Sequence, residues 1–256
     1  MRMIGAALEP LRSDPSGSAV IVDFDGTLAP IVVDPRAARP LPGVGEVLLA
    51  LARRYARVAV VSGRPLAYLG AHLPASIDVA GLYGLEERRS GELVEHPLAA
   101  TWRPVIDETA AAALDQLPEG VEVEHKGLSL TLHTRRHPER AEQAAAWAAT
   151  MGAATGLDVR GGKQSVELHP PIDVDKGTVV SGLVAGLRAA CFLGDDLGDL
   201  PAFAALDRFA AGGGAAVRIA VASAEAPPEL LAAADLQVDG PQGALELLQA
   251  LAVPSG

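Results

Sequence analysis

The chain has 256 residues, which corresponds to one large domain or two small ones. Its formal net charge is -11, from 21 Lys and Arg against 32 Asp and Glu, and this acidic balance argues against a nucleic-acid-binding protein, which usually carries a basic surplus. The single cysteine excludes an intrachain disulfide, and we expect neither a secretory signal nor a membrane span, hence a soluble cytoplasmic protein without membrane or nucleic-acid partners.

The first part of the chain alternates apolar strands with helices. Residues 18–24 (SAVIVDF) form a continuous apolar run, which predicts a strand that is buried on both faces. Residues 41–55 have apolar residues at helical spacing, and the apolar runs at 57–64 and 77–84 each end in small residues and a turn. This strand–helix–strand rhythm predicts an α/β fold with a doubly wound parallel sheet.

The rhythm changes in the middle of the chain and returns at Lys176. Residues 86–96 predict a hairpin that turns at Ser90 and Gly91. A helix, two period-two strands, a second helix and two more strands are then predicted at 101–118, 121–127, 128–135, 138–154, 157–162 and 164–170. We therefore predict a core made of residues 1–98 and 173–256, with residues 99–172 inserted as a smaller α+β domain.

Two of the apolar strands end in carboxylates. Asp23 and Asp25 follow the first strand, and Asp195, Asp196 and Asp199 follow the apolar run AACFLG. Ligands bind outside the carboxyl ends of strands in open parallel sheets, so we expect both clusters to face one crevice. Two such close aspartates repel each other unless a cation lies between them. Carboxylate oxygens without nearby Cys or His favour Mg²⁺ over zinc.

A single aspartate at the end of a strand has a simpler interpretation as a helix cap or a turn residue. This alternative applies above all to Asp199, which precedes the helical segment LPAFAAL. Two clusters on two strand ends favour a metal site over this alternative, and we expect Asp199 to lie behind the direct ligands.

Two other places could bind an anion. Ser62, Gly63 and Arg64 follow a strand, and the hydroxyl and backbone N–H groups of such a turn can form an anion-binding nest. Lys176 opens a helix, where its charge opposes the helix dipole, and it follows the acidic stretch DVD. The alternatives are an ordinary capped turn and a solvated surface lysine.

The segments DFDGTL, SGR, a lysine that opens a helix, and GDDLGD occur in this order and resemble the four motifs of the haloacid-dehalogenase-type phosphatases. The inserted domain resembles the larger cap of that superfamily (C2-type, αββαββ) on its Rossmann-like core. Within it, EHKGLSLTLHTR and GKQSVELHPPIDVDKG, together with GLYG at 81–84, resemble trehalose-6-phosphate phosphatases.

The resemblance implies a role for each motif residue. Asp23 would be the nucleophile and a metal ligand, and Asp25 the general acid and base, with its backbone carbonyl on the metal. Asp195 would be a further metal ligand, with Asp196 and Asp199 behind it. Ser62 and Lys176 would hold phosphate oxygens, and the cofactor would be Mg²⁺. Substrate ligands would be Gly63, Arg64, Glu124, Lys126 and Glu167, followed by Arg135, His133 and Lys163.

The match has departures, and the substrate has alternatives. Gly198 and Leu200 stand where the family usually has threonine and glutamate, and His169 stands where arginine is common. The resemblance implies hydrolysis of trehalose 6-phosphate, a small-molecule sugar phosphate. The alternatives are another sugar phosphatase, acting on sucrose phosphate or mannosyl-3-phosphoglycerate, and a non-catalytic sugar-phosphate sensor. The oligomeric state does not follow from the sequence, and a monomer is the default.

Overall fold

The structure is a computed structural model, and it describes residues 6–162 and 164–253. Lys163, one of the predicted substrate ligands, lies outside the described residues. The chain divides into a core unit, Met1–Val94 with Val174–Gly256, and an inserted unit, Glu95–Asp173.

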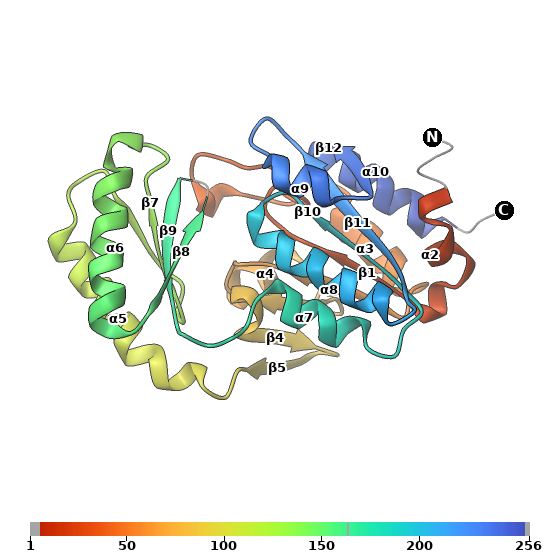
Figure 1. Cartoon of the computed structure of the whole chain (residues 1–256), viewed down its shortest axis with the longest axis horizontal. Helices are drawn as coiled ribbons and strands as arrows, with labels where there is room; N and C mark the ends of the chain where they lie inside the picture. The colour runs from red at the N-terminus through yellow and green to blue at the C-terminus, as the bar shows by residue number, and fades with distance from the viewer. Residues whose placement is uncertain (1–5, 163, 254–256) are drawn as a thin grey trace. The chain divides into compact units, whose positions relative to one another are not determined.

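An eight-stranded sheet forms the centre of the core unit, in the order β12-β11-β10-β1-β2-β3-β4-β5 (Figure 1). Its strands are β1 (Ser18–Val22), β2 (Arg57–Val61), β3 (Asp78–Gly81), β4 (Glu86–Arg89), β5 (Glu92–Glu95), β10 (Ala189–Gly194), β11 (Ala215–Ala222) and β12 (Leu236–Asp239). The strands from β12 to β3 are parallel, and β4 is antiparallel to β3. The sheet confirms the predicted α/β architecture. Because β1 lies between β2 and β10, the strand order reverses at β1, and the carboxyl ends of all three strands meet at one edge.

Helices cover both faces of this sheet. One face carries α2 (Glu9–Ser13), α3 (Val44–Ala52), α4 (Leu66–His72) and α10 (Gly240–Ala252), and the other carries α7 (Lys176–Val184), α8 (Leu200–Ala211) and α9 (Pro228–Ala233). Along β1, Val20 and Val22 pack into the first layer and Ile21 into the second. All five residues of β1 are buried, which explains why the strand is a continuous apolar run.

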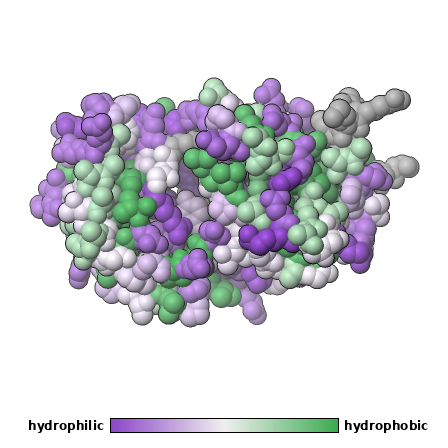
Figure 2. Space-filling view, in the orientation of Figure 1, coloured by the Kyte–Doolittle hydropathy of each residue, from purple (hydrophilic) through white to green (hydrophobic). Residues whose placement is uncertain are grey.

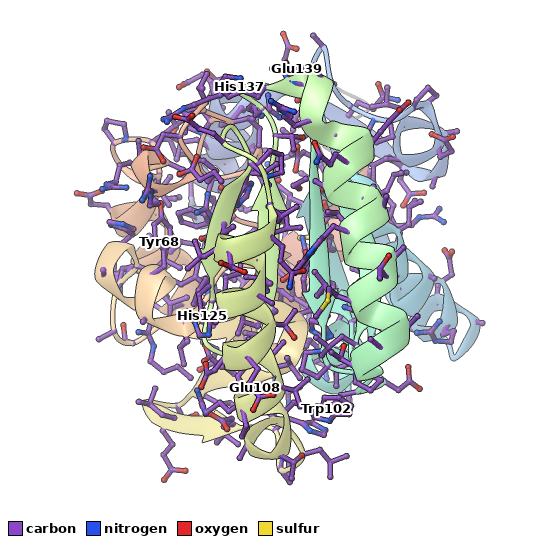
Figure 3. The ribbon with its side chains drawn as sticks, turned by 90° about the vertical axis from the view of Figure 1, so that its left-hand side faces the viewer. Tyr68, Trp102, Glu108, His125, His137 and Glu139 are labelled. Carbon is purple, nitrogen blue, oxygen red and sulfur yellow. The ribbon has the colours of Figure 1, made fainter. Side chains whose placement is uncertain are left out.

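The inserted unit contains a separate four-stranded antiparallel sheet in the order β6-β7-β9-β8. Its elements are α5 (Ala99–Gln116), β6 (Glu122–His125), β7 (Leu130–His133), α6 (Ala141–Thr155), β8 (Asp158–Gly162) and β9 (Ser165–His169), which confirms the predicted order. Helix α5 packs on β6 and β7, and α6 packs on β8 and β9, so both cover the same face of the sheet (Figure 3). The apolar strand residues Leu130, Leu132, Val166 and Leu168 point into this helix-covered core, which leaves the alternate residues on the other face.

The described surface is mixed in polarity. Hydrophilic and hydrophobic residues are interspersed on the face shown in Figure 2. The longest of the described helices, α5, has 18 residues and an exposed polar side, and no helix in residues 6–162 and 164–253 combines the length and hydropathy that crossing a bilayer requires.

Candidate metal and phosphate site

Three buried carboxylates meet at the ends of β1 and β10. Asp23 directly follows β1, Asp195 directly follows β10, and Asp199 ends the short 3-10 helix η5 (Leu197–Asp199). Their residues are 3%, 2% and 0% exposed, and one oxygen from each lies within 4.8 Å of the others. Asp23 from the first acidic cluster of the sequence and Asp195 and Asp199 from the second therefore form a single group.

Lys176 supplies a positive charge to this group. It is the first residue of α7, and its Nζ donates to Oδ1 of Asp23 and to Oδ1 of Asp199, both at 2.7 Å. The neighbouring Asp175 caps the helix by accepting a hydrogen bond from the backbone N–H of Thr178. Lys176 is only 4% exposed, so the alternative of a solvated surface lysine is wrong.

Burial dominates the electrostatics of the cluster. It raises the pKa of Asp23 well above the ordinary value; Lys176 opposes this shift, and Asp199 and Asp195 add to it. Burial also raises the pKa of Asp199. Burial by itself would lower the pKa of Lys176, but Asp199 and Asp23 raise it well above the ordinary value. Three carboxylates around one ammonium carry excess negative charge, so a divalent cation with oxygen ligands fits this donor set.

Asp199 does not act as the cap of α8, contrary to the simpler interpretation of the sequence. Its Oδ2 accepts hydrogen bonds from the backbone N–H of Asp195 at 2.8 Å and of Asp196 at 3.1 Å, and its side chain makes no capping bond to α8. Asp196 is the N-cap of η5, because its Oδ1 accepts a hydrogen bond from the N–H of Gly198 at 2.8 Å. Asp199 thus shares the buried cluster, while the half-buried Asp196 is bonded within its own turn.

Two glycines allow the carboxylates to approach the backbone. Gly26 has a φ of +76°, and a Cβ at this position would lie 2.1 Å from a carboxylate oxygen of Asp195. A Cβ at Gly194 would lie 2.3 Å from the carboxylate carbon of Asp199. The glycines of DFDG and GDD therefore serve the close packing of the two motifs as well as the turn.

The turn after β2 combines a buried hydroxyl with a tight backbone. Ser62 is 1% exposed, and its Oγ accepts a hydrogen bond from the N–H of Arg64 at 3.1 Å, which leaves the hydroxyl proton to donate to an anion. The phenol ring of Tyr83 packs so close to Gly63 that a Cβ there would lie 2.6 Å from it. Tyr83 has a left-handed backbone with a φ of 60°, uncommon for a bulky residue. Tyr83 belongs to the GLYG segment at 81–84, but its position in the sequence gives no signal of this contact with Gly63.

Arg64 binds Asp25. Its Nε donates to Oδ2 of Asp25 at 2.7 Å, and its Nη2 donates to Oδ1 at 2.8 Å. The side chain of Arg64 is 9% exposed and that of Asp25 is 31% exposed. The predicted phosphate ligand Arg64 thus directs two of its nitrogens at the predicted acid–base carboxylate.

Glu124 and Glu167, two of the predicted sugar ligands, lie on the face of the inserted unit's sheet that is opposite its helices. The strand register aligns Glu124, Thr131, Glu167 and Arg160 in one row across β6, β7, β9 and β8. Because side chains alternate along a strand, the two glutamates point away from the core of the inserted unit. Arg135 follows β7 and is half-buried.

Neighbouring side chains hold these glutamates in place. Glu167, 6% exposed, accepts a hydrogen bond from Oγ of Ser129 at 2.6 Å and pairs with Nζ of Lys126 at 3.4 Å. Glu124 contacts Nε2 of His133 at 2.7 Å. In the segment EHKGLSLTLHTR, the serine (Ser129) thus contacts Glu167 and the second histidine (His133) contacts Glu124. The spacing of these residues along the sequence does not reveal either contact.

Two of the three departures from the family pattern, His169 and Gly198, differ in their surroundings. His169 ends β9 and is fully buried, and its Nδ1 lies 2.8 Å from the carbonyl oxygen of Pro170. Gly198 is exposed and offers only its backbone N–H to Asp196.

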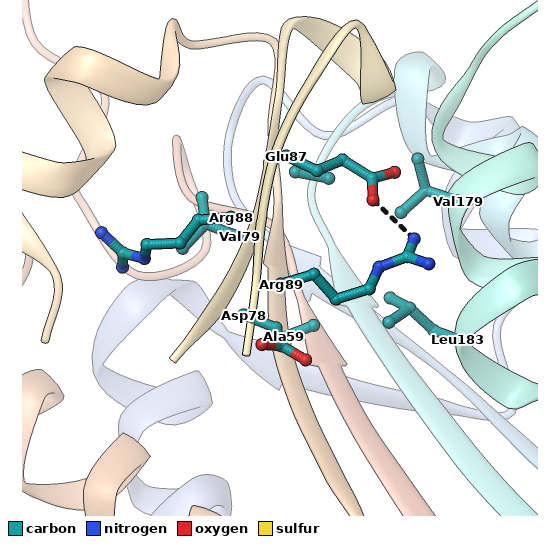
Figure 4. A pocket seen from close by; sticks show the side chains of 9 residues that line it. Ala59, Asp78, Val79, Glu87, Arg88, Arg89, Val179 and Leu183 are labelled. Carbon is teal, nitrogen blue, oxygen red and sulfur yellow. Dashed lines mark ion pairs between the residues drawn. The ribbon is translucent and has the colours of Figure 1, made fainter. Parts of the chain in front are cut away.

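A small pocket of the core unit lies elsewhere, beside β3 and β4 (Figure 4). Asp78, Arg88, Arg89 and Val179 contribute to its lining, and Glu87 pairs with Arg89 at 2.5 Å. Among the described residues, those that line this pocket include no predicted site residue. We therefore do not assign the substrate to it.

Solved structures identify the fold. A haloacid dehalogenase-like hydrolase from Bacteroides thetaiotaomicron is similar to this chain with a TM-score of 0.62, at 17% sequence identity, over 91% of this chain and 99% of that chain. At this identity the likeness concerns the fold alone. The chain therefore has the α/β fold of a haloacid dehalogenase-like hydrolase, with a buried carboxylate cluster at the ends of two strands.

The sequence comparisons identify the family. The Trehalose-phosphatase family model matches residues 21–241. The Trehalose-phosphate phosphatase of Mycobacterium leprae is 35% identical over 212 residues, which are 76% of this chain and 49% of that protein. The C-terminal domain of trehalose-6-phosphate phosphatase from C. albicans has a TM-score of 0.80 at 25% identity, over 97% of this chain and 96% of that chain. This chain belongs to the trehalose-phosphatase family. It spans about half the length of the curated relatives that it matches.

The packing of Gly26 makes a prediction that stability measurements can test. Gly43 also has a positive φ, of +90°, but a Cβ there would meet nothing within 4 Å. Gly43→Ala should therefore cost only the backbone strain of about 1–2 kcal/mol. Gly26→Ala should cost ~1–3 kcal/mol more, because its Cβ displaces Asp195. Urea unfolding of the two variants checks the difference, and equal losses of unfolding free energy would contradict the close approach at Gly26.

Proposed function

We propose that this chain is a Mg²⁺-dependent phosphatase that hydrolyses trehalose 6-phosphate to trehalose and phosphate, the last step of trehalose biosynthesis. The observation that carries the proposal is the buried cluster of Asp23, Asp195, Asp199 and Lys176 at the ends of β1 and β10. Membership of the trehalose-phosphatase family supports the choice of substrate. In this proposal residues 1–98 and 173–256 perform the catalysis, and residues 99–172 select the sugar.

The acidic cluster provides the metal site. Asp23, Asp195 and the backbone carbonyl of Asp25 would hold Mg²⁺, with Asp196 or Asp199 behind them; the position of Asp199 among the buried carboxylates favours Asp199. When bound, the cation neutralises charge on the phosphoryl group. Lys176 and Ser62 donate hydrogen bonds to the phosphate oxygens. Both side chains are buried; Ser62 directly follows β2, and Lys176 is the first residue of α7.

The reaction takes place in two steps at phosphorus. In the first, the carboxylate of Asp23 attacks phosphorus, the bond between phosphorus and the sugar oxygen breaks, and Asp25 gives its proton to that oxygen. In the second, water attacks the aspartyl-phosphate and passes a proton to Asp25. The bond between phosphorus and the Asp23 oxygen then breaks, which releases phosphate and restores both aspartates.

The polar row of the inserted unit favours a neutral sugar as the leaving group. Glu124 and Glu167 accept hydrogen bonds from hydroxyl groups, and Lys126 donates to them. A phosphoglycerate substrate would bring a carboxylate, which the two glutamates repel; Lys126 already pairs with Glu167, and Arg160 is aligned with it. A sugar-phosphate sensor would have no need of a buried nucleophile such as Asp23.

A phosphate-release screen over a panel of sugar phosphates tests the proposal. We expect trehalose 6-phosphate to be hydrolysed with the highest kcat/KM, ahead of sucrose 6-phosphate and mannosyl-3-phosphoglycerate. Asp23→Asn should abolish release, because an amide cannot attack phosphorus, and circular dichroism of the metal-free variant checks that it folds. Turnover by Asp23→Asn, or a preference for another sugar, would overturn the assignment.

The raised carboxyl pKa values predict how the metal stabilises the protein. Because the pKa of Asp23 and of Asp199 is raised by burial, their contribution to folding stability is complete below the ordinary carboxyl range and is lost as pH rises through the raised pKa. Mg²⁺ binds the ionised carboxylates. The increase in Tm on adding Mg²⁺ to EDTA-treated protein should therefore be larger at about pH 8 than at about pH 5.

Thermal unfolding followed by circular dichroism, with and without Mg²⁺, measures this increment. Activity should be lost in EDTA and return with Mg²⁺. An increment that is the same at both pH values, or that persists in Asp23→Asn and Asp199→Asn, would contradict a metal site at these carboxylates.

Glu167 should separate sugar recognition from phosphate chemistry. Glu167→Ala should lower kcat/KM for trehalose 6-phosphate by about 10²-fold, because hydrogen bonds to charged groups contribute about 1.5–3 kcal/mol. It should have much less effect on p-nitrophenyl phosphate, which has no sugar. The control is Glu108→Ala on the exposed side of α5 (Figure 3), which should change neither rate. Equal losses on both substrates would show that Glu167 is not a sugar ligand.

A further inference from the structure

Arg64 and Asp25 form a two-pronged ion pair whose geometry suits the orientation of a carboxylate. The Nε–Oδ2 and Nη2–Oδ1 distances of 2.7 and 2.8 Å place both oxygens of Asp25 on one planar edge of the guanidinium. A carboxylate that accepts such a fork keeps further lone pairs on each oxygen. The partners differ in exposure, 9% for Arg64 and 31% for Asp25, so the arginine is buried while one side of the aspartate is open.

Both the backbone and the guanidinium group of Arg64 are held in place. Its backbone N–H donates to Oγ of Ser62 at 3.1 Å, and its carbonyl oxygen accepts from the N–H of Leu82 at 2.9 Å. Its guanidinium carbon lies 4.6 Å from the ring centroid of Tyr68, which places the cation over the aromatic ring.

Tyr68 connects this arginine to the strand end that carries the aspartates. Its ring meets that of Phe24 edge to face, with 5.9 Å between centroids. Phe24 is fully buried and lies between Asp23 and Asp25 in the chain. The side chains of Phe24, Tyr68, Arg64 and Asp25 therefore form one continuous chain of contacts within the core unit.

We propose that Arg64 is a positioning residue, which binds Asp25 instead of the phosphate and holds its carboxylate in the orientation that proton transfer requires. The inference rests on the proposed function, since it assigns a partner to the acid–base residue of that reaction. Ser62 and Lys176 remain the donors for phosphate. Proton transfer is sensitive to the position of the acid, so loss of the fork should impair the step in which the sugar oxygen is protonated.

The test compares two leaving groups in variants of Arg64. Trehalose leaves as a basic alkoxide that needs a proton, whereas p-nitrophenolate leaves without one. The parameter kcat/KM reports the steps up to cleavage of the phosphorus–oxygen bond to the leaving group, and excludes the later hydrolysis of the aspartyl-phosphate. Arg64→Lys keeps the charge but cannot form the fork or stack flat on Tyr68.

We expect Arg64→Lys to lower kcat/KM for trehalose 6-phosphate by about 10²-fold, the lower range for general acid catalysis, with a much smaller loss for p-nitrophenyl phosphate. Asp25→Asn should show the same selectivity. The double variant should be no slower on the sugar phosphate than Asp25→Asn alone, because Arg64 acts through Asp25.

Arg218→Lys is the matched control. Arg218, which lies on β11, forms a similar fork with Asp235, with Nε–Oδ2 and Nη2–Oδ1 distances of 3.0 and 2.6 Å. The Arg218→Lys variant should show no selectivity between the substrates. Retained hydrolysis of p-nitrophenyl phosphate, together with the Tm, shows that the variants fold; Arg64→Gln replaces Arg64→Lys if the lysine variant does not.

Equal losses on both substrates would overturn the proposal and make Arg64 a phosphate ligand. No loss on either would show that the ion pair is incidental. If the wild-type protein prefers another sugar phosphate, the proposed substrate fails, but the ratio measured with that sugar phosphate still decides the role of Arg64.

Discussion

The site depends on one interaction: the ammonium group of Lys176 binds the carboxylates of both Asp23 and Asp199. Buried carboxylates are costly unless they are paired. Here the chain buries three of them at the ends of two adjacent strands and supplies one lysine from the start of α7. The pair of 2.7 Å contacts keeps the cluster together, and the remaining negative charge suits a divalent cation.

The residues around this cluster are also held in place by close packing and hydrogen bonds. Gly26 and Gly194 lack side chains where carboxylates press against the backbone, and Asp199 satisfies two backbone N–H groups while it faces Lys176. Such side chains are fixed by their own packing before any ligand arrives. When the side chains of a site are already ordered, less of the substrate's binding free energy is lost in ordering them.

In the inserted unit, polar side chains are also fixed by their neighbours. Ser129 and Lys126 hold Glu167, and His133 holds Glu124, all on the sheet face that the helices leave uncovered. In both units, a carboxylate with a proposed role in substrate binding or catalysis is therefore oriented by a second side chain. The ion pair of Arg64 with Asp25, the proposed acid–base residue, follows the same arrangement.

The sequence by itself determined the architecture and the identity of the acidic residues, because continuous apolar runs, helical periodicity and strand ends are local properties of the chain. Lys176 was identified for the same reason, as a charge opposed to a helix dipole. Only the tertiary structure decided partners. Asp199 could be taken for a helix cap, and Arg64 for a phosphate ligand, since spacing along the chain does not show which side chains meet. Asp25 and Arg64 are 39 positions apart in the chain, and Lys176 and Asp199 are 23 apart. The order of the strands brings each pair together, and this order exists only once the whole sheet has folded.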